Sequence, residues 1–221
     1  VDGGLGDDVL ELDGSVGVTG EGGGGADTVQ LVGETNDASL SGVETVFGSA
    51  GDDSLTINTS HIETVSGGEG FDDVTLTAAF GNTVEFEGVE AVTGSIGADT
   101  LLIGTNDIQS LSGGDGLDVV LLTDAAGNTA QLDSIEFITG GDGADTLTVT
   151  DDTSVVLDGG LGDDILLGGG GDDTLISGGG SDVIVGGLGD DFLELDGALL
   201  ITADGGDGLD TVRLIGDTNE V

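Results

Sequence analysis

The feature that most constrains this chain is a run of four nine-residue units between Gly159 and Glu194. The units read GGLGDDILL, GGGGDDTLI, SGGGSDVIV and GGLGDDFLE. Glycine dominates the first, second and fourth places, Asp stands sixth, and an apolar residue stands eighth. Because glycine adopts positive φ and allows close approach of the backbone, each unit predicts a tight turn followed by a very short strand.

The turn signature x-x-x-G-x-D recurs along the whole chain. It starts at residues 3, 22, 48, 67, 94, 113, 140, 159, 168, 177, 186 and 205. Spacings of 19 alternate with spacings of 26 or 27, and the tandem block divides one spacing of 27 into three nines. The underlying unit is therefore about 46 residues long, with starts at 3, 48, 94, 140 and 186. We predict one continuous solenoid domain over residues 1–221.

A larger repeat is superimposed on this unit. Residues 3–37 match residues 186–220 at 22 of 35 positions, with an offset of 183. The sequence shows no capping repeat with a polar outer face, which solenoids usually need for solubility. We therefore expect a segment of a longer array, or a subunit whose ends stack on its neighbours.

The nonapeptide resembles the G-G-x-G-x-D-x-U-x repeat of RTX proteins, the hemolysin-type calcium-binding repeat family. The resemblance covers the chain from Gly3 onward and is most specific over residues 159–194. It implies an all-β fold, a right-handed parallel β-roll or β-solenoid in which two nonapeptides form one coil. It also implies that Ca²⁺ ions lie between turns stacked on the same side.

In the family, the earlier turn of a pair gives its second and fourth carbonyls and its Asp, and the later turn gives its first and third carbonyls and its Asp. Turn starts 18 or 19 residues apart qualify, which implies about seven Ca²⁺ ions, at the pairs 3/22, 48/67, 94/113, 140/159, 159/177, 168/186 and 186/205. The implied carboxylate ligands are Asp8, Asp27, Asp53, Asp72, Asp99, Asp118, Asp145, Asp164, Asp173, Asp182, Asp191 and Asp210. The implied carbonyl ligands are Gly4, Gly6, Gly22, Gly24, Gly141, Gly143, Gly159, Gly160, Leu161, Gly162, Gly169, Gly171, Ser177, Gly179, Gly186, Gly187, Leu188, Gly189, Gly205 and Asp207.

Some positions depart from the pattern. Ser49 and Ser95 stand in second place, where a left-handed conformation is harder to reach, so we expect weaker binding at 48/67 and 94/113. Acids in fifth place are interpreted as solvated or outer groups. The long spacers keep a V/I-E-x-V/I pattern with Glu44, Glu90 and Glu136, and we interpret these as half-coils that retain the strand but have lost the calcium turn. Their glutamates are expected to be solvated rather than ligands.

Composition supports a cation-dependent fold. The chain has 45 acidic residues and one basic residue, and its formal charge of −44 opposes compaction unless cations are bound. Nucleic acid and anionic membranes are therefore poor partners, and no apolar run is long enough for membrane insertion. Zero Cys residues exclude disulfides, and Ca²⁺ is the alternative staple for an extracellular chain. Six Phe without Trp or Tyr predict a thin core of Val, Leu and Ile.

We predict strands directly after each turn, in coils of about 18 residues whose neighbours are about 4.8 Å apart. A unit of 46 residues then spans about two and a half coils, so successive units alternate sides. The predicted strands are Val9–Leu12, Thr28–Val32, Ser54–Ile57, Asp73–Thr77, Thr100–Ile103, Val119–Thr123, Thr146–Thr150, Ile165–Leu167, Thr174–Ile176, Val183–Val185, Phe192–Leu195 and Thr211–Ile215.

These observations favour a non-enzymatic structural role. His61 is the only histidine, which excludes a His-based triad with a second His and a His-rich metal site. We expect a secreted, calcium-binding repeat segment of an extracellular fibre, sheath, surface layer or adhesin, capable of self-association as a filament. The alternatives are a folding module attached to an enzyme or toxin exported by type I secretion, and an ice- or surface-binding solenoid. An enzyme domain upstream in the full gene would favour the first alternative.

Overall fold

The fold is known from a computed structural model, which describes residues 1–13, 15, 17–59, 61–105, 107–196 and 200–216. Within these residues there are 24 strands and no helix, so the prediction of an all-β parallel solenoid is confirmed. The chain forms two compact units, Val1–Leu117 and Asp118–Val221, which are described separately.

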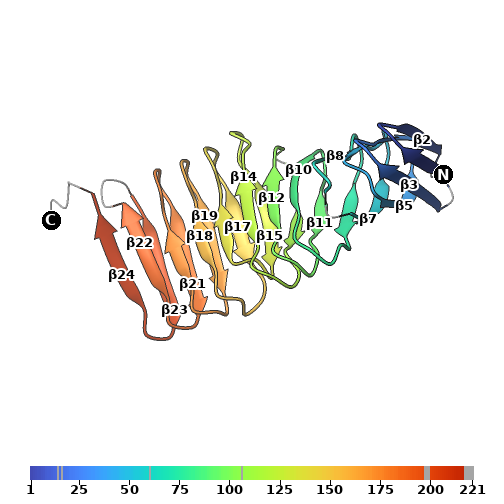
Figure 1. Cartoon of the computed structure of the whole chain (residues 1–221). Coiled ribbons are helices and arrows are strands. Elements are labelled where there is room, and N and C mark those ends of the chain that lie inside the picture. The colour runs from blue at the N-terminus through green and yellow to red at the C-terminus, as the bar shows by residue number, and fades with distance from the viewer. Residues whose placement is uncertain (14, 16, 60, 106, 197–199, 217–221) are drawn as a thin grey trace. The chain divides into compact units, whose positions relative to one another are not determined.

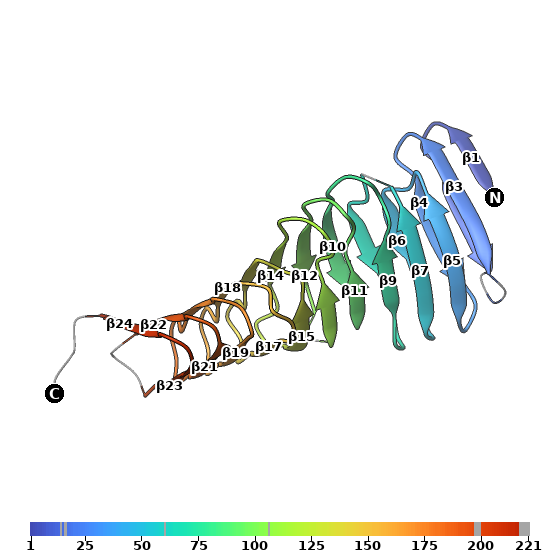
Figure 2. The ribbon, with the colours of Figure 1, turned by 90° about the horizontal axis from the view of Figure 1, so that it is seen from below.

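In the first unit, odd-numbered and even-numbered strands form two parallel sheets (Figure 1, Figure 2). The odd sheet has the order β1 (Asp2–Leu5), β3 (Val18–Gly24), β5 (Asn36–Ser41), β7 (Asp53–Asn58), β9 (Asp73–Leu76), β11 (Ala91–Thr93) and β13 (Ser110–Ser112). The even sheet has the order β2 (Val9–Asp13), β4 (Thr28–Val32), β6 (Thr45–Phe47), β8 (Thr64–Ser66), β10 (Thr83–Glu87) and β12 (Thr100–Ile103). The chain thus passes from one sheet to the other and back in every coil.

The second unit repeats this arrangement. Its odd strands are β15 (Thr129–Asp133), β17 (Thr146–Val149), β19 (Ile165–Gly169), β21 (Val183–Leu188) and β23 (Thr202–Asp207). Its even strands are β14 (Val119–Leu122), β16 (Phe137–Thr139), β18 (Val156–Asp158), β20 (Thr174–Ile176), β22 (Phe192–Asp196) and β24 (Thr211–Ile215). In both units, strand partners such as Leu10 and Val29, or Leu166 and Ile184, come from consecutive coils.

The turns form two edges, which differ in the direction of the chain. We call the turns from an odd strand to the next even strand the first edge, and the turns from an even strand to the next odd strand the second edge. In the first unit the turns that start at residues 3 and 94 lie on the first edge, and the turn at 48 lies on the second. In the second unit the turn at 140 lies on the second edge and the turn at 186 on the first. The predicted alternation of sides is therefore confirmed within each unit.

The core is a ladder of aliphatic side chains between the two sheets. The eighth residue of each nonapeptide points inward, and eleven of the twelve are at most 4% exposed: Leu10, Val29, Leu55, Val74, Leu101, Val120, Leu147, Leu166, Leu175, Ile184 and Leu193. Val212, in the last described strand, is the exception at 53%. Burial of such a side chain contributes about 1.5–3 kcal/mol, so this place holds the coils together before any ion is considered.

The half-coils use the same core. Both apolar residues of each V/I-E-x-V/I pattern are buried, as Val89 and Val92 show at 1% and 2% exposure. The strands β6, β11 and β16 contain the second of these residues. The prediction that the half-coils keep a strand without the calcium turn is confirmed.

All twelve predicted strands are present, with small differences at their ends. The larger repeat is also visible locally, because β22 and β24 have the same bounds as β2 and β4 after a shift of 183 residues. Residues 197–199 and 217–220 of that repeat lie outside the described residues.

Candidate calcium sites

The sixth-place aspartates of stacked turns are joined by direct hydrogen bonds. In six of the seven predicted pairs, the backbone N–H of the earlier Asp donates to Oδ1 of the later Asp. The N–O distances are 2.9 Å for Asp8–Asp27, 2.8 Å for Asp53–Asp72, 2.8 Å for Asp145–Asp164, 3.0 Å for Asp164–Asp182, 2.9 Å for Asp173–Asp191 and 3.1 Å for Asp191–Asp210. The seventh pair, at 94/113, has its aspartates in different units and stays a prediction.

These carboxylates are withdrawn from solvent. Ten of the twelve are at most 2% exposed, namely Asp27, Asp53, Asp72, Asp99, Asp118, Asp145, Asp164, Asp173, Asp182 and Asp191. Asp8 is half-buried and Asp210 is exposed. Because burial of an ionised carboxylate costs several kcal/mol unless it is paired, a chain with this many buried carboxylates requires a counter-charge.

Protein groups satisfy only one oxygen of most of these carboxylates. Oδ2 is buried without a hydrogen-bond partner in Asp8, Asp27, Asp72, Asp145, Asp164, Asp173, Asp182 and Asp191. Native proteins rarely leave buried polar atoms unpaired, and one standard explanation is a bound ion. The same atom, in the same place of the repeat, is unpaired in both units.

A carbonyl oxygen approaches each of these Oδ2 atoms beside the first-place glycine. At Gly168, a Cβ atom would lie 2.5 Å from Asp173 Oδ2 and 2.5 Å from the carbonyl oxygen of Gly186, the first residue of the next turn. At Gly3, the corresponding distances to Asp8 Oδ2 and the Gly22 oxygen are 2.9 and 2.7 Å. Glycine is thus required where two oxygens converge, and the hollow has the hard oxygen ligands that Ca²⁺ prefers.

The other predicted carbonyls hold the turns together. The third-place N–H of Gly179 donates to the carbonyl of Gly160 at 2.7 Å, and the N–H of Gly162 donates to the carbonyl of Gly179 at 2.7 Å. Equivalent bonds run from Leu161 to Gly141, from Gly6 to Gly24 and from Gly189 to Asp207. Since a carbonyl has a second lone pair, these bonds are compatible with ion binding. The assignment of the second- and third-place carbonyls as ligands stays a prediction.

Side chains supply almost no positive charge to balance the buried carboxylates. The one Arg, Arg213, is 61% exposed and pairs with Glu194 at 3.1 Å. Among the described residues, no group of three or more His, Cys, Asp and Glu side chains gathers as a metal cluster. Each candidate site instead combines two carboxylates with backbone carbonyls, a donor set that suits Ca²⁺ better than a softer metal.

The two serines act differently from the expectation of a merely awkward turn. The N–H and hydroxyl of Ser49 contact Oδ2 of Asp53 at 2.7 and 3.2 Å, and Ser95 contacts Oδ2 of Asp99 at 2.7 and 3.0 Å. Neither serine is among the described residues with positive φ, whereas Gly160 and Gly187 in the same place have φ of 86° and 117°. The serine therefore satisfies the oxygen that faces the hollow elsewhere, which supports weaker binding at these turns.

Three asparagines that the sequence interpretation missed precede the first Asp turn of a pair. The side-chain amide of Asn36 donates to Asp53 Oδ1 at 2.7 Å, and its backbone N–H donates to the same atom at 2.8 Å. Asn82 and Asn128 make the same contacts with Asp99 and Asp145. The signal was present in the sequence, because these asparagines are spaced by 46 residues and each lies 17 residues before its Asp.

The glutamates of the half-coils are not simply solvated. Oε2 of Glu44, Glu90 and Glu136 accepts the backbone N–H of Asp27, Asp72 and Asp118 respectively, each at 2.7 Å. Glu90 is only 8% exposed and the other two are half-buried. The expectation of solvated glutamates is therefore wrong: a longer side chain reaches the N–H that the next Asp accepts from in a full turn.

Fifth-place acids form a second, exposed ladder along the same edges. Asp163 accepts the N–H of Ser181 at 2.8 Å, and Asp172 accepts the N–H of Asp190 at 2.8 Å. The interpretation of these acids as outer groups agrees with their exposure. Each one also tethers its turn to the turn of the following coil.

The burial of the sixth-place carboxylates raises their pKa. Desolvation raises the pKa of Asp72 and Asp164 from the ordinary value of 3.8 to about 6, and that of Asp173 to about 7. The pKa values of Asp145, Asp182 and Asp191 shift in the same direction for the same reason. Without metal, the folded chain therefore holds protons that the unfolded chain releases above about pH 4.

A pH dependence follows for the metal-free protein. Because the folded form binds more protons than the unfolded form between about pH 4 and 7, its stability falls as pH rises through that range. We expect a higher melting temperature near pH 5 than at pH 8 in buffer stripped of divalent ions, measured by far-UV circular dichroism. With saturating Ca²⁺ the order should reverse, since ligand carboxylates must be deprotonated. Greater stability at pH 8 without metal would contradict these shifts.

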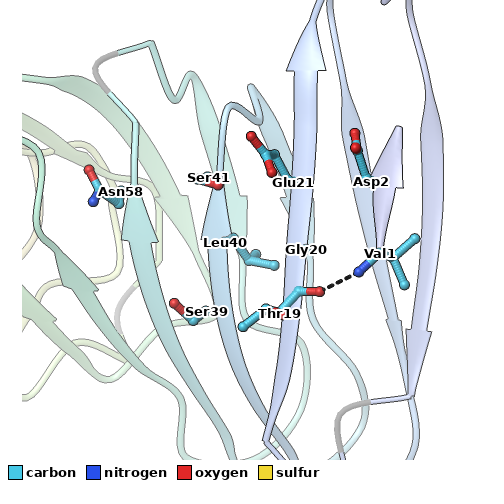
Figure 3. Close-up of a pocket in the computed structure, with 9 residues that line it drawn as sticks. All are labelled: Val1, Asp2, Thr19, Gly20, Glu21, Ser39, Leu40, Ser41 and Asn58. Carbon is cyan, nitrogen blue, oxygen red and sulfur yellow. Dashed lines mark hydrogen bonds between the residues drawn. The ribbon is translucent and has the colours of Figure 1, made fainter. Parts of the chain in front are cut away.

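One further hollow lies on the first unit, beside Gly20 of β3 (Figure 3). Its lining includes Val1, whose amino group donates to the carbonyl of Thr19 at 2.7 Å. The two acids in the lining, Asp2 and Glu21, are exposed. This hollow therefore lacks the buried carboxylate of the turns. His61 is exposed between β7 and β8, as expected.

The fold and the turns together define a calcium-binding parallel β-solenoid. The family of the RTX calcium-binding nonapeptide repeat matches four copies, over residues 40–56, 133–152 and 158–193. The chain is therefore built on RTX calcium-binding repeats, as the nonapeptides indicated. No curated protein matches it. Among the described residues, none forms a helix of the length and apolar character needed to cross a membrane.

Proposed function

We propose that this chain is a structural segment of an extracellular fibre, sheath, surface layer or adhesin, and that Ca²⁺ folds and stiffens it. The observation that carries the proposal is the stack of buried aspartates whose Oδ2 atoms have no protein partner. Such a stack is costly without cations and stabilising with them. Extracellular fluids commonly supply millimolar Ca²⁺, whereas the cytosol does not, so the fold forms after export.

The regular repeat supports an extended role rather than a catalytic one. The unit of 46 residues places its turns in the same structural environment in both units, and β22 and β24 reproduce β2 and β4 after 183 residues. A segment that returns to its own starting pattern can continue into a further copy, covalently or between subunits. We propose that the chain associates in this way and has no enzymatic activity of its own.

Assembly provides the direct test. We expect the 221-residue chain to form filaments or long rods in millimolar Ca²⁺, visible in negative-stain images, and to lose them in excess chelator. The physical reason is that unpaired strand edges at the end of a parallel stack are templates for further strands. Compact, monodisperse particles in Ca²⁺ would argue against the filament and leave the calcium-dependent fold standing.

A folding and secretion module attached to an enzyme or toxin is the second candidate. The four tandem nonapeptides between Gly159 and Glu194 favour it, because such a block is a compact calcium-dependent folding unit. The two roles differ in what lies outside this chain. Many more units of 46 residues in the same gene would support the fibre, and a catalytic domain would support the module.

A further inference from the structure

We propose that the half-coils form a second class of calcium site, in which a glutamate takes the place of the later aspartate. The sites are Asp27 with Glu44, Asp72 with Glu90, and Asp118 with Glu136. They rest on the proposed calcium-dependent folding, and they lie outside the seven pairs of nonapeptide turns.

The glutamate occupies the position of an aspartate in the stack. Asp72 donates its N–H to Glu90 Oε2 at 2.7 Å, just as Asp173 donates its N–H to Asp191 Oδ1 at 2.9 Å. The two acceptors come 18 residues after their donors in both cases. The longer side chain compensates for a turn with fewer residues, so one carboxylate oxygen binds the backbone and the carboxylate still faces the earlier turn.

The hollow that marks the nonapeptide sites is also present here. A Cβ atom on Gly67 would collide with Asp72 Oδ2 and with the carbonyl oxygen of Gly88. Gly22 is enclosed in the same way by Asp27 Oδ2 and the Gly42 oxygen. These are the two kinds of oxygen that converge beside Gly168 in the tandem block.

Charge and burial require a cation at this place. Asp72 is 0% exposed, its Oδ2 has no protein partner, and Glu90 beside it is 8% exposed. The only Arg of the chain is engaged with Glu194, and there is no Lys. Two neighbouring buried carboxylates without a basic side chain are stable only with a bound cation or proton. Oxygen ligands from two carboxylates and a carbonyl fit Ca²⁺.

The backbone of the half-coil is held in the conformation that this arrangement needs. Gly42, Gly88 and Ser134 stand two residues before the three glutamates and have φ of 55°, 56° and 53°. Ser134 is the only non-glycine residue with positive φ in the described part of the chain. A left-handed serine costs on the order of 1–3 kcal/mol. Its persistence where the carbonyl lines the hollow supports a functional role for that carbonyl.

The site depends on the preceding Asp turn rather than on the sequence motif. Glu63 stands in the same pattern, IETV, and its flanking residues Ile62 and Val65 are buried at 2% and 0%. However, Glu63 follows the half-coil of Glu44, to whose carbonyl its N–H donates at 2.8 Å, and its side chain is exposed. It therefore provides a matched control within the same unit.

The test counts bound Ca²⁺ in the 221-residue chain by equilibrium dialysis with elemental analysis, at saturating Ca²⁺. Glu90→Gln keeps the length and an oxygen acceptor for the Asp72 N–H but removes the charge. We expect it to lose one equivalent of Ca²⁺, whereas Glu63→Gln loses none. A triple change of Glu44, Glu90 and Glu136 to Gln should lose three equivalents. Far-UV circular dichroism in Ca²⁺ verifies that each variant is folded.

The outcomes separate this proposal from the proposed function. An unchanged count in folded Glu90→Gln and Glu44→Gln overturns the glutamate sites while the wild type still binds Ca²⁺ at its nonapeptide turns. A wild type that binds no Ca²⁺ overturns both. If Glu90→Gln does not fold in Ca²⁺, the count for Glu44→Gln, at the other site of this type in the first unit, decides the matter against Glu63→Gln.

Discussion

Removal of Ca²⁺ at pH 8 is expected to abolish the strand signal in far-UV circular dichroism, and restoring millimolar Ca²⁺ is expected to bring it back. The cause is the set of ten sixth-place aspartates that are at most 2% exposed, most of them with an unpaired Oδ2. Without cations these carboxylates must remain buried and charged or take up protons, and the formal charge of −44 adds repulsion along the chain. Ion binding is then part of the folding free energy.

Magnesium is the appropriate control for this experiment. Mg²⁺ requires near-octahedral geometry at about 2.0–2.1 Å and retains water, whereas Ca²⁺ accepts several carbonyls at about 2.3–2.6 Å. We expect equal concentrations of Mg²⁺ to restore much less of the signal. A strand-rich spectrum that persists in excess EGTA at low ionic strength would show that the core alone folds the chain.

The change Asp164→Ala is expected to have the largest effect of any single substitution in the turns. Asp164 accepts the N–H of Asp145, donates its own N–H to Asp182, and turns Oδ2 toward the hollow beside Gly159. Its loss removes a ligand from two neighbouring sites and leaves a buried N–H without its acceptor. Loss of one partner from a buried charged pair typically costs about 3–5 kcal/mol. We expect two fewer bound Ca²⁺ ions by calorimetric titration and a lower melting temperature.

The neighbouring residue Asp163 is the matched control. It belongs to the same turn and also accepts a backbone N–H from the next coil, but it is exposed. We expect Asp163→Ala to keep the full number of ions, with a small decrease in melting temperature. Equal losses in the two variants would mean that net charge, rather than position in the turn, controls binding.

The sequence predicted the turns and their following strands well because these elements combine two local signals. A glycine-rich turn with Asp in sixth place is followed by an apolar residue in eighth place, and residues such as Leu166 and Leu193 are fully buried as that pattern requires. The other twelve strands were assigned no bounds. One reason is visible in β3, whose sequence VTGEGGG resembles a loop and which pairs with β1 and β5 across coils.

The ends of the aspartate pairs were harder to predict. Asn36 and Glu90 belong to turns without the glycine signature, and each acts through a hydrogen bond to a residue one coil away. Local sequence carries no direct sign of such a contact. The period of 46 residues does carry one, because amide and carboxylate side chains recur at fixed distances before and after each Asp pair. Period, rather than motif, was the informative property there.

The hydrogen bonds between successive aspartates all have the same direction, and this gives each edge a polarity. Every sixth-place N–H depends on a carboxylate of the following coil, as Asp173 depends on Asp191 and Asp191 on Asp210. If a later turn is lost, the turn before it is left with an unsatisfied donor. If an earlier turn is lost, the turn after it keeps its own acceptor. Order along each edge is therefore transmitted more strongly from C-terminal coils to N-terminal coils than in the opposite direction.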